Sequence, residues 1–296
     1  MKLLSFIRPD GVASAGRLDS GERVVDLGRP LPALIADSMP QETPPGADVF
    51  HLAEVTLQPV VPEPSKIIAA PVNYRDHQAE MNEAYHIDAL GIFLKAPSSV
   101  VAHGGTIRLP YTDRRFDQEG ELALVIGRPG RDIDVTDALH HVAGYTCLLD
   151  ITMRGGEDRS TRKSFDTFTP VGPYLVTPDE AGPLESLTLR TWVGEELRQD
   201  ADIKDLIWSV PRLIAYASSV MTLHTGDIIT TGTPAGVGAI ADGDRITVEI
   251  DRIGRLQATV SAQDAVPCPT KGAHRGPTPP PTVTPVRTEP ANRRPQ

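Results

Sequence analysis

Residues 116–127 read FDQEGELALVIG, an acidic stretch that runs directly into an apolar one. The second half, residues 122–126 closed by Gly127, predicts a short buried β-strand. Side chains alternate between the two faces of a strand, so Glu119 and Glu121 should point the same way. Two carboxylates on one face are stable if water screens them, if one stays protonated, or if a cation lies between them. The spacing alone therefore fits a solvated strand face as well as the beginning of a metal site.

The composition is that of an ordinary globular protein and excludes several classes of function. The formal net charge of −10 argues against a nucleic-acid surface. The two cysteines, Cys147 and Cys268, give no disulfide framework. No apolar run approaches the roughly 20 residues of a membrane span, and the N-terminus does not fit a signal peptide. We therefore expect a cytoplasmic protein without membrane contact.

Breaks in the pattern divide the chain into three parts. Residues 1–60 predict a small N-terminal β domain, which the stiff, proline-bearing stretch 60–65 separates from the rest. Residues 66–262 contain more predicted strands than helices, without regular alternation, which favours a mostly β, α+β fold. Residues 267–296 hold nine of the 28 prolines. We expect residues 263–296 to form a disordered, basic, proline-rich tail whose removal leaves turnover unchanged.

Asp150 adds a third carboxylate to the acidic pair. It ends a predicted apolar strand over residues 144–149, where an unpaired carboxylate would be costly. Three carboxylates at strand ends suit a hard divalent cation such as Mg²⁺, which keeps coordination positions for water or substrate oxygens. Asp150 could instead cap a neighbouring turn, so the spacing leaves both interpretations open.

Three further groups could take part in chemistry. His77 and Glu80 share a face of a predicted helix over residues 75–82, and a histidine oriented by a carboxylate can take a proton from water near neutral pH. Taken alone, the pair is better explained as a surface ion pair. Lys163 lies in a charged segment and, taken alone, is better explained as a surface lysine than as a group that faces a bound anion. The glycine-rich loop 232–238 either approaches a small anion or is an ordinary turn. It contains neither the Gly-Lys-Ser/Thr of a P-loop nor the G-x-G-x-x-G motif, so it does not predict nucleotide binding.

Taken in order, these segments resemble the fumarylacetoacetate hydrolase family. The matching segments are NYRDHQAE (73–80), FLK (93–95), EGELALVIG (119–127), AGYT (143–146) with Asp150, KSFDTF (163–168), GP (172–173), GD (226–227) and TGTPAGVG (231–238). The resemblance covers about residues 66–262.

The resemblance implies a particular fold and cofactor. The fold is a mixed β-sandwich or β-roll catalytic domain, usually a homodimer, behind a small N-terminal β domain. The cofactor is Mg²⁺, with Mn²⁺ possible, held by Glu119, Glu121 and Asp150. A lid around His77 and Glu80 would become ordered when the substrate binds.

The resemblance also implies a reaction on a small 2-oxo or diketo acid. This reaction is hydrolysis of a C–C bond in an acylpyruvate or fumarylacetoacetate-like acid through a metal-bound enolate. Glu80 would orient His77, which deprotonates a water, and Lys163 would offset the charge of the pyruvate-type enolate. Arg154 would hold the substrate carboxylate, and Thr233 would contact the substrate.

Other functions stay open at this stage. The same metal-enolate chemistry without water gives an isomerase or decarboxylase, and a hydratase is a third branch, acting on a 2-hydroxy-diene or 2-oxo-ene dicarboxylate of aromatic catabolism. A non-catalytic binding module is the alternative from another class. The chain departs from the family pattern at Leu149, at Gly155 and at Pro71-Val72, and the segment 150–163 is short. These positions belong to the expected pocket wall, where substrate choice is made.

Overall fold

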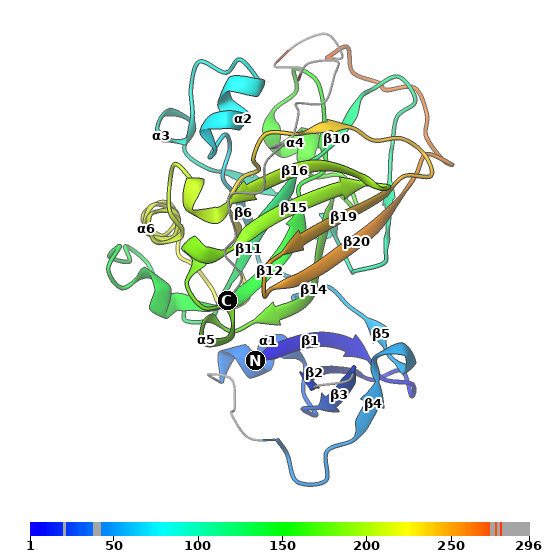
Figure 1. Cartoon of the computed structure of the whole chain (residues 1–296), viewed down its shortest axis with the longest axis vertical. Helices are drawn as coiled ribbons and strands as arrows, with labels where there is room; N and C mark the ends of the chain where they lie inside the picture. Colours follow the sequence, from blue (N-terminus) through cyan, green and yellow to red (C-terminus); the bar gives the residue numbers. More distant parts are fainter. Residues whose placement is uncertain (20–21, 38–42, 273–275, 277–278, 280–296) are drawn as a thin grey trace, which may run out of the picture.

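The computed structural model describes residues 1–19, 22–37 and 43–272, together with Gly276 and Pro279. Three β-sheets form the framework of this part of the chain, and short helices lie around them (Figure 1). The helices do not alternate regularly with the strands, so the predicted mostly β, α+β class is confirmed.

The largest sheet has twelve strands and runs through the whole molecule. Its main path is β4-β3-β2-β1-β14-β12-β11-β17-β6-β7, with β5 paired to β1 and β8 paired to β14. The strands are β1 (Lys2–Ile7), β2 (Ala13–Asp19), β3 (Arg23–Asp26), β4 (Val49–His51), β5 (Thr56–Leu57), β6 (Ile67–Ala69), β7 (Phe93–Lys95), β8 (Val100–Val101), β11 (Gly120–Ile126), β12 (Val142–Leu149), β14 (Thr169–Val176) and β17 (Ile228–Thr230).

A five-stranded sheet packs against the central strands of the large one, as Figure 1 shows for β15, β16, β19 and β20 in front of β11 and β12. In order it contains β16 (Glu196–Asp202), β15 (Thr188–Val193), β19 (Arg245–Ile250), β20 (Gly254–Ser261) and β9 (Thr106–Arg108). A third, small sheet contains β13 (Thr152–Met153), β10 (Phe116–Gln118) and β18 (Gly238–Ala239). The face-to-face packing of two sheets buries one large apolar core.

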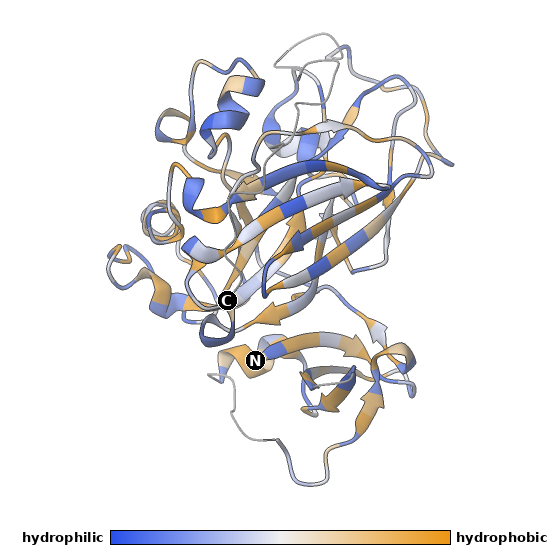
Figure 2. Cartoon of the chain, viewed as in Figure 1, coloured by the Kyte–Doolittle hydropathy of each residue, from blue (hydrophilic) through white to orange (hydrophobic). Residues whose placement is uncertain are grey.

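The helices are short and lie at the margins of the sheets. They are α1 (Leu31–Ala36), α2 (Arg75–Glu80), α3 (Ile87–Leu90), α4 (Arg159–Lys163), α5 (Pro178–Ala181) and α6 (Val210–Val220), with 3₁₀ turns at Leu52–Glu54, Pro97–Ser99, Ala138–His141, Leu184–Ser186 and Ile203–Asp205. Figure 2 shows that α2 is mostly hydrophilic, whereas apolar residues concentrate on the strands. Within the described ranges, no helix has the length and apolar character needed to cross a membrane.

The two faces of β11 have different neighbours. Leu122 and Leu124 belong to the core shared with the five-stranded sheet. Ala123 and Val125 belong to a second core on the opposite side, which also contains Leu31 of α1. Because side chains alternate along a strand, Glu119 and Glu121 lie on the Ala123 side, away from the five-stranded sheet.

The N-terminal elements β1–β5 and α1 form a lobe at the bottom of Figure 1. Strand β1 pairs with β14 through Lys2↔Val176 and Leu3↔Leu175, so the lobe continues the large sheet. The division of the chain near residue 60 stays a prediction, since this lobe and the remaining chain share one hydrogen-bonded ladder.

The first residues of the predicted tail pack against the body. The Val266 amide donates to Pro110 O at 3.0 Å, and the Cys268 amide donates to Asp113 Oδ1 at 2.8 Å. The expectation of disorder from residue 263 is therefore wrong for residues 263–272, because these backbone groups find defined partners. The remainder of the predicted tail lies outside the described residues, apart from Gly276 and Pro279.

Candidate metal centre

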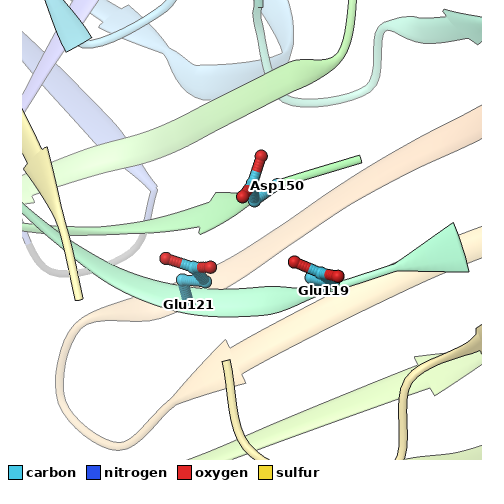
Figure 3. A group of neighbouring side chains, drawn as sticks. All are labelled: Glu119, Glu121 and Asp150. Carbon is cyan, nitrogen blue, oxygen red and sulfur yellow. The ribbon is translucent and has the colours of Figure 1, made fainter. Parts of the chain in front are cut away.

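Three carboxylates meet where β11 and β12 lie side by side. The register places Gly120 opposite Leu149, and the Asp150 amide donates to Glu119 O at 2.8 Å. Asp150 therefore lies directly across from Glu119, and Figure 3 shows Glu119 and Glu121 pointing from one strand toward it. One oxygen from each carboxylate lies within 4.8 Å of the others, and all three residues are buried. The three acids that the sequence singled out are thus brought together, and they form neither a solvated face nor a turn cap.

Two buried lysines contact these acids. Lys163, only 6% exposed, donates from Nζ to Glu119 Oε2 at 2.6 Å and to Asp150 Oδ2 at 2.5 Å. Lys95, 2% exposed, donates to the other oxygen of Asp150 and to Phe168 O at 3.1 Å. Lys163 is therefore not a surface lysine. Sequence reasoning missed Lys95, although its position at the end of an apolar strand segment was a usable signal.

The electrostatics of the two glutamates differ sharply. Burial raises the pKa of Glu119, but Lys163 and Arg154 outweigh it and lower the pKa to about 2. Burial and the Asp150 carboxylate raise the pKa of Glu121 to about 8. Among the described residues Glu121 forms no ion pair. Its carboxylate instead accepts hydrogen bonds from the Thr230 hydroxyl and, at 2.8 Å, from the Gly232 amide.

This donor set fits a hard divalent cation. Glu121 is a buried carboxylate that forms no ion pair within the described structure, and two further carboxylates lie within reach of the same point. Such a cluster is costly unless a charge compensates it, and oxygen ligands are those that Mg²⁺ and Mn²⁺ prefer. Glu119, Glu121 and Asp150 would hold the ion.

The predicted pair of His77 and Glu80 forms beside the same acids, and His77 lines one cavity with Glu119 and Glu121. His77 is 6% exposed, and its Nδ1 lies 3.0 Å from Glu80 Oε2. The Gly236 amide donates to the other Glu80 oxygen at 2.9 Å, which fixes the carboxylate. The surface-pair interpretation is therefore wrong, because the pair is buried and its orientation is set by the glycine-rich loop.

Arg154 lies inside the site but already has two carboxylate partners. Its Nε donates to Asp117 Oδ2 at 2.6 Å, and its Nη2 donates to Glu119 Oε1 at 3.0 Å. Asp117 is fully buried and was missed as a site residue. Its spacing of two and four residues from Glu119 and Glu121 was the signal that could have found it.

The loop that follows β17 also forms part of the site. Thr233 Oγ1 donates to Gly120 O at 2.9 Å and accepts from Gln199 Nε2 at 2.7 Å, so its hydroxyl is engaged. Gly232 has a φ of +88°, and an added Cβ there would come within 2.9 Å of Asn73 Cβ. A glycine is needed here to bring the amide onto Glu121.

One cavity joins these groups. Its lining contains His77, Glu119, Glu121, Arg154, Lys163 and Thr233, and also Ala70, Pro71, Val72, Met81, Glu83, Phe93, Arg159 and Arg162. Of the predicted site residues, Asp150 and Glu80 lie behind this lining and contact it through Lys163 and His77. The arrangement can bind a cation, place a base beside it and offer positive charge to an anionic ligand.

Comparison with known proteins gives a consistent result. Residues 66–261 match the family model described as fumarylacetoacetate (FAA) hydrolase, C-terminal. A maleylpyruvate hydrolase from Aquipseudomonas alcaligenes is 44% identical over 220 residues, which cover 71% of this chain and 77% of the relative. An oxaloacetate tautomerase from Bacillus subtilis is 42% identical over 225 residues, covering 71% of this chain and 75% of the relative.

A solved structure agrees over a longer part of the chain. It is a maleylpyruvate hydrolase from Sphingobium sp. SYK-6 in complex with manganese(II) ion and pyruvate, and its TM-score is 0.77 at 36% identity. The match covers 88% of this chain and 99% of that structure.

Proposed function

The chain belongs to the fumarylacetoacetate hydrolase family, and we propose that it hydrolyses a C–C bond of an acylpyruvate-like 2-oxo acid with the help of Mg²⁺ or Mn²⁺. The observation that carries this proposal is the cluster of three buried carboxylates, two of which line one cavity together with the histidine of the buried histidine–glutamate pair. The similarity to two maleylpyruvate hydrolases supports the hydrolytic reaction.

The metal would be held by Glu119, Glu121 and Asp150. When bound, a divalent cation supplies Lewis-acid polarisation of the substrate oxygens and stabilises developing negative charge. Arg154 has a supporting task in this proposal, because it fixes Glu119 through a 3.0 Å hydrogen bond. It would also meet the substrate carboxylate at the cavity wall, where Thr233 provides a second contact surface.

The protein groups would perform the proton transfers. Glu80 orients His77, which takes a proton from water as the water oxygen bonds to the distal carbonyl carbon. The C–C bond then breaks, its electron pair goes to the pyruvate fragment, and the proton is delivered to that fragment's carbon. Lys163, held between two of the acids, would offset the negative charge that develops on the departing fragment.

The runner-up function is an isomerase or decarboxylase, with a hydratase as a further branch, acting on a 2-hydroxy-diene or 2-oxo-ene dicarboxylate. The 42% identity to an oxaloacetate tautomerase favours keeping it. This reaction needs the same cation and the same proton carrier but no attacking water. The two functions therefore differ in their products rather than in their residues.

Product analysis on a small panel tests the proposal. Acetylpyruvate, maleylpyruvate and oxaloacetate are incubated with Mn²⁺, with Mg²⁺ and with a chelator. We expect pyruvate plus a carboxylic acid from the first two substrates, loss of turnover with the chelator, and recovery when Mn²⁺ is added back. A shift of tautomer or release of CO₂ without acid product would support the runner-up, and full turnover in chelator would refute both.

A histidine variant adds a test of the base. His77→Asn should lower kcat by roughly 10²- to 10⁴-fold, the usual contribution of general-base catalysis, while Mn²⁺ binding is retained. His140→Asn is the matched control, since His140 is exposed and pairs with Asp137 away from the cavity. Equal activity of the two variants would remove His77 from the mechanism.

The family resemblance also predicts a homodimer, and size-exclusion chromatography with light scattering measures this directly.

A further inference from the structure

Four basic side chains line the cavity, and three of them already have carboxylate partners. The pairs are Arg154 with Asp117 at 2.6 Å, Arg159 with Glu83 at 3.7 Å and Lys163 with Asp150 at 2.5 Å. Arg162 is the fourth, and it has no carboxylate partner among the described residues. It is nevertheless buried, with only 7% of its surface exposed.

Main-chain carbonyls hold the Arg162 guanidinium in place. Nε donates to Glu157 O at 2.8 Å, and Nη1 donates to Met153 O at 3.3 Å. Within the described part of the chain, Nη2 makes no hydrogen bond. Carbonyls orient a guanidinium but do not neutralise it, so Arg162 brings to the cavity wall a positive charge that has no ion-pair partner among the described residues.

Two hydrogen bonds also hold the side chain of Glu157 in place. Arg114 Nη2 donates to Glu157 Oε2 at 2.5 Å, and the Thr270 hydroxyl donates to the other carboxylate oxygen. The carbonyl that accepts from Arg162 therefore belongs to a residue whose side chain is clamped. The guanidinium is pre-organised rather than free to turn toward one of the neighbouring acids.

A buried charge without a partner is costly, and an anionic ligand would remove that cost. The planar guanidinium is suited to carboxylates, which it binds through charge-assisted hydrogen bonds. Arg162 forms no ion pair with the three acids of the metal centre, whereas the next residue, Lys163, contacts two of them. A 2-oxo acid group placed at the acids would therefore leave Arg162 for a second, separate anionic group.

We propose that Arg162 binds a second carboxylate, at the end of the substrate remote from the 2-oxo acid group. The natural substrate is then a dicarboxylate, and Arg162 discriminates it from acylpyruvates that carry a neutral acyl group. This inference rests on the proposed function, since it assumes that the 2-oxo acid group lies at the three carboxylates.

Two substrates and three variants test the assignment. Maleylpyruvate carries the second carboxylate and acetylpyruvate does not, so kcat/KM is measured for both with the Mn²⁺-loaded enzyme. Arg162→Met should lower kcat/KM for maleylpyruvate about 10- to 150-fold, the range expected for hydrogen bonds to charged groups, and change it less than about threefold for acetylpyruvate. Arg162→Lys keeps the charge and should recover part of the loss. Arg255→Met, an exposed arginine outside the cavity, controls for the loss of a surface charge.

The outcomes separate this inference from the proposed function. Equal losses for both substrates, or no loss for maleylpyruvate, would overturn the role of Arg162 while hydrolysis by the wild-type enzyme still stands. If the wild type hydrolyses neither substrate, the proposed function fails. Calorimetry with Mn²⁺ then decides on Arg162: 2-oxoglutarate should bind more tightly than 2-oxobutyrate to the wild type, and Arg162→Met should abolish that difference. Unchanged Mn²⁺ binding by Arg162→Met shows that the variant is folded.

Discussion

Gly120 offers a sharp test of how the metal centre is built, because it lies between the two glutamates of the acidic pair. Its amide donates to Gln199 Oε1 at 2.9 Å, and its Cα faces the five-stranded sheet. A Cβ added at this position would lie 2.1 Å from Thr191 Oγ1 and 3.2 Å from Val248 Cγ2. The Gly120→Ala change should therefore push β11 and β15 apart beside the two glutamates of the metal centre.

The expected cost follows from these distances. The Thr191 hydroxyl would have to withdraw by about 1 Å, and a β-branched side chain has few alternative rotamers. Overpacking of this kind costs about 1–3 kcal/mol. For a chain of this size, at about 2–4 °C per kcal/mol, the melting temperature should fall by roughly 2–12 °C. The acids on either side should be displaced with the strand, so Mn²⁺ affinity should fall as well.

The assay is thermal or urea unfolding of the metal-free protein, followed by calorimetric titration with Mn²⁺. Thr191→Ala is the matched partner, because the Thr191 hydroxyl is buried without a hydrogen-bond partner in the described structure. Alone it should cost little, and combined with Gly120→Ala it should restore most of the lost stability. If Gly120→Ala melts within about 1 °C of the wild type, or if the double variant shows no recovery, the close packing of β15 on β11 is not what fixes the site.

Three further predictions test other parts of the molecule. Because the pKa of Glu121 is raised to about 8, the folded metal-free protein keeps a proton that the unfolded chain releases near pH 4.3. The free energy of unfolding should therefore decline as pH rises from about 4 through 8. Urea unfolding of Glu121→Gln should show a flatter decline. Burial raises the pKa of Cys147 to about 12, so at pH 8 a thiol reagent should modify Cys268 alone in the native protein and both cysteines after unfolding; rapid modification of two thiols would contradict the burial of Cys147. Truncation after Pro279 should leave kcat/KM unchanged. Truncation after Gln263 should lower kcat/KM several-fold, because it removes the contacts behind the cavity wall. Equal activity of the two truncated proteins would show that the whole tail is dispensable.

Much of the acidic site could be predicted from alternation along one strand. Glu119 and Glu121 share a face by spacing alone. Asp150 directly follows β12, the strand that pairs with β11. Asp117 lies two residues before Glu119 and could have been added by the same rule. Local periodicity is sufficient here because these residues lie in or directly beside short extended segments, and β11 and β12 are adjacent antiparallel strands.

The partners of other groups could not be predicted, because they depend on contacts between distant segments. Gln199 donates to Thr233 from a strand of the other sheet, and Lys95 reaches Asp150 across 55 positions of the chain. Nothing in the local sequence of Arg162 separates it from the charged residues beside it. What distinguishes Arg162 is the absence of a carboxylate partner in the described structure, and only three-dimensional neighbours reveal that.

The ladder between β1 and β14 has a practical consequence for dissecting this chain. Deleting the N-terminal lobe would strip the Lys2–Ile7 strand from Val176 and Leu175, and would leave open backbone donors and acceptors at what becomes a sheet margin. Exposed margins of this kind template intermolecular pairing. An isolated catalytic portion should therefore self-associate and come out insoluble, even though every residue that faces the cavity is still present.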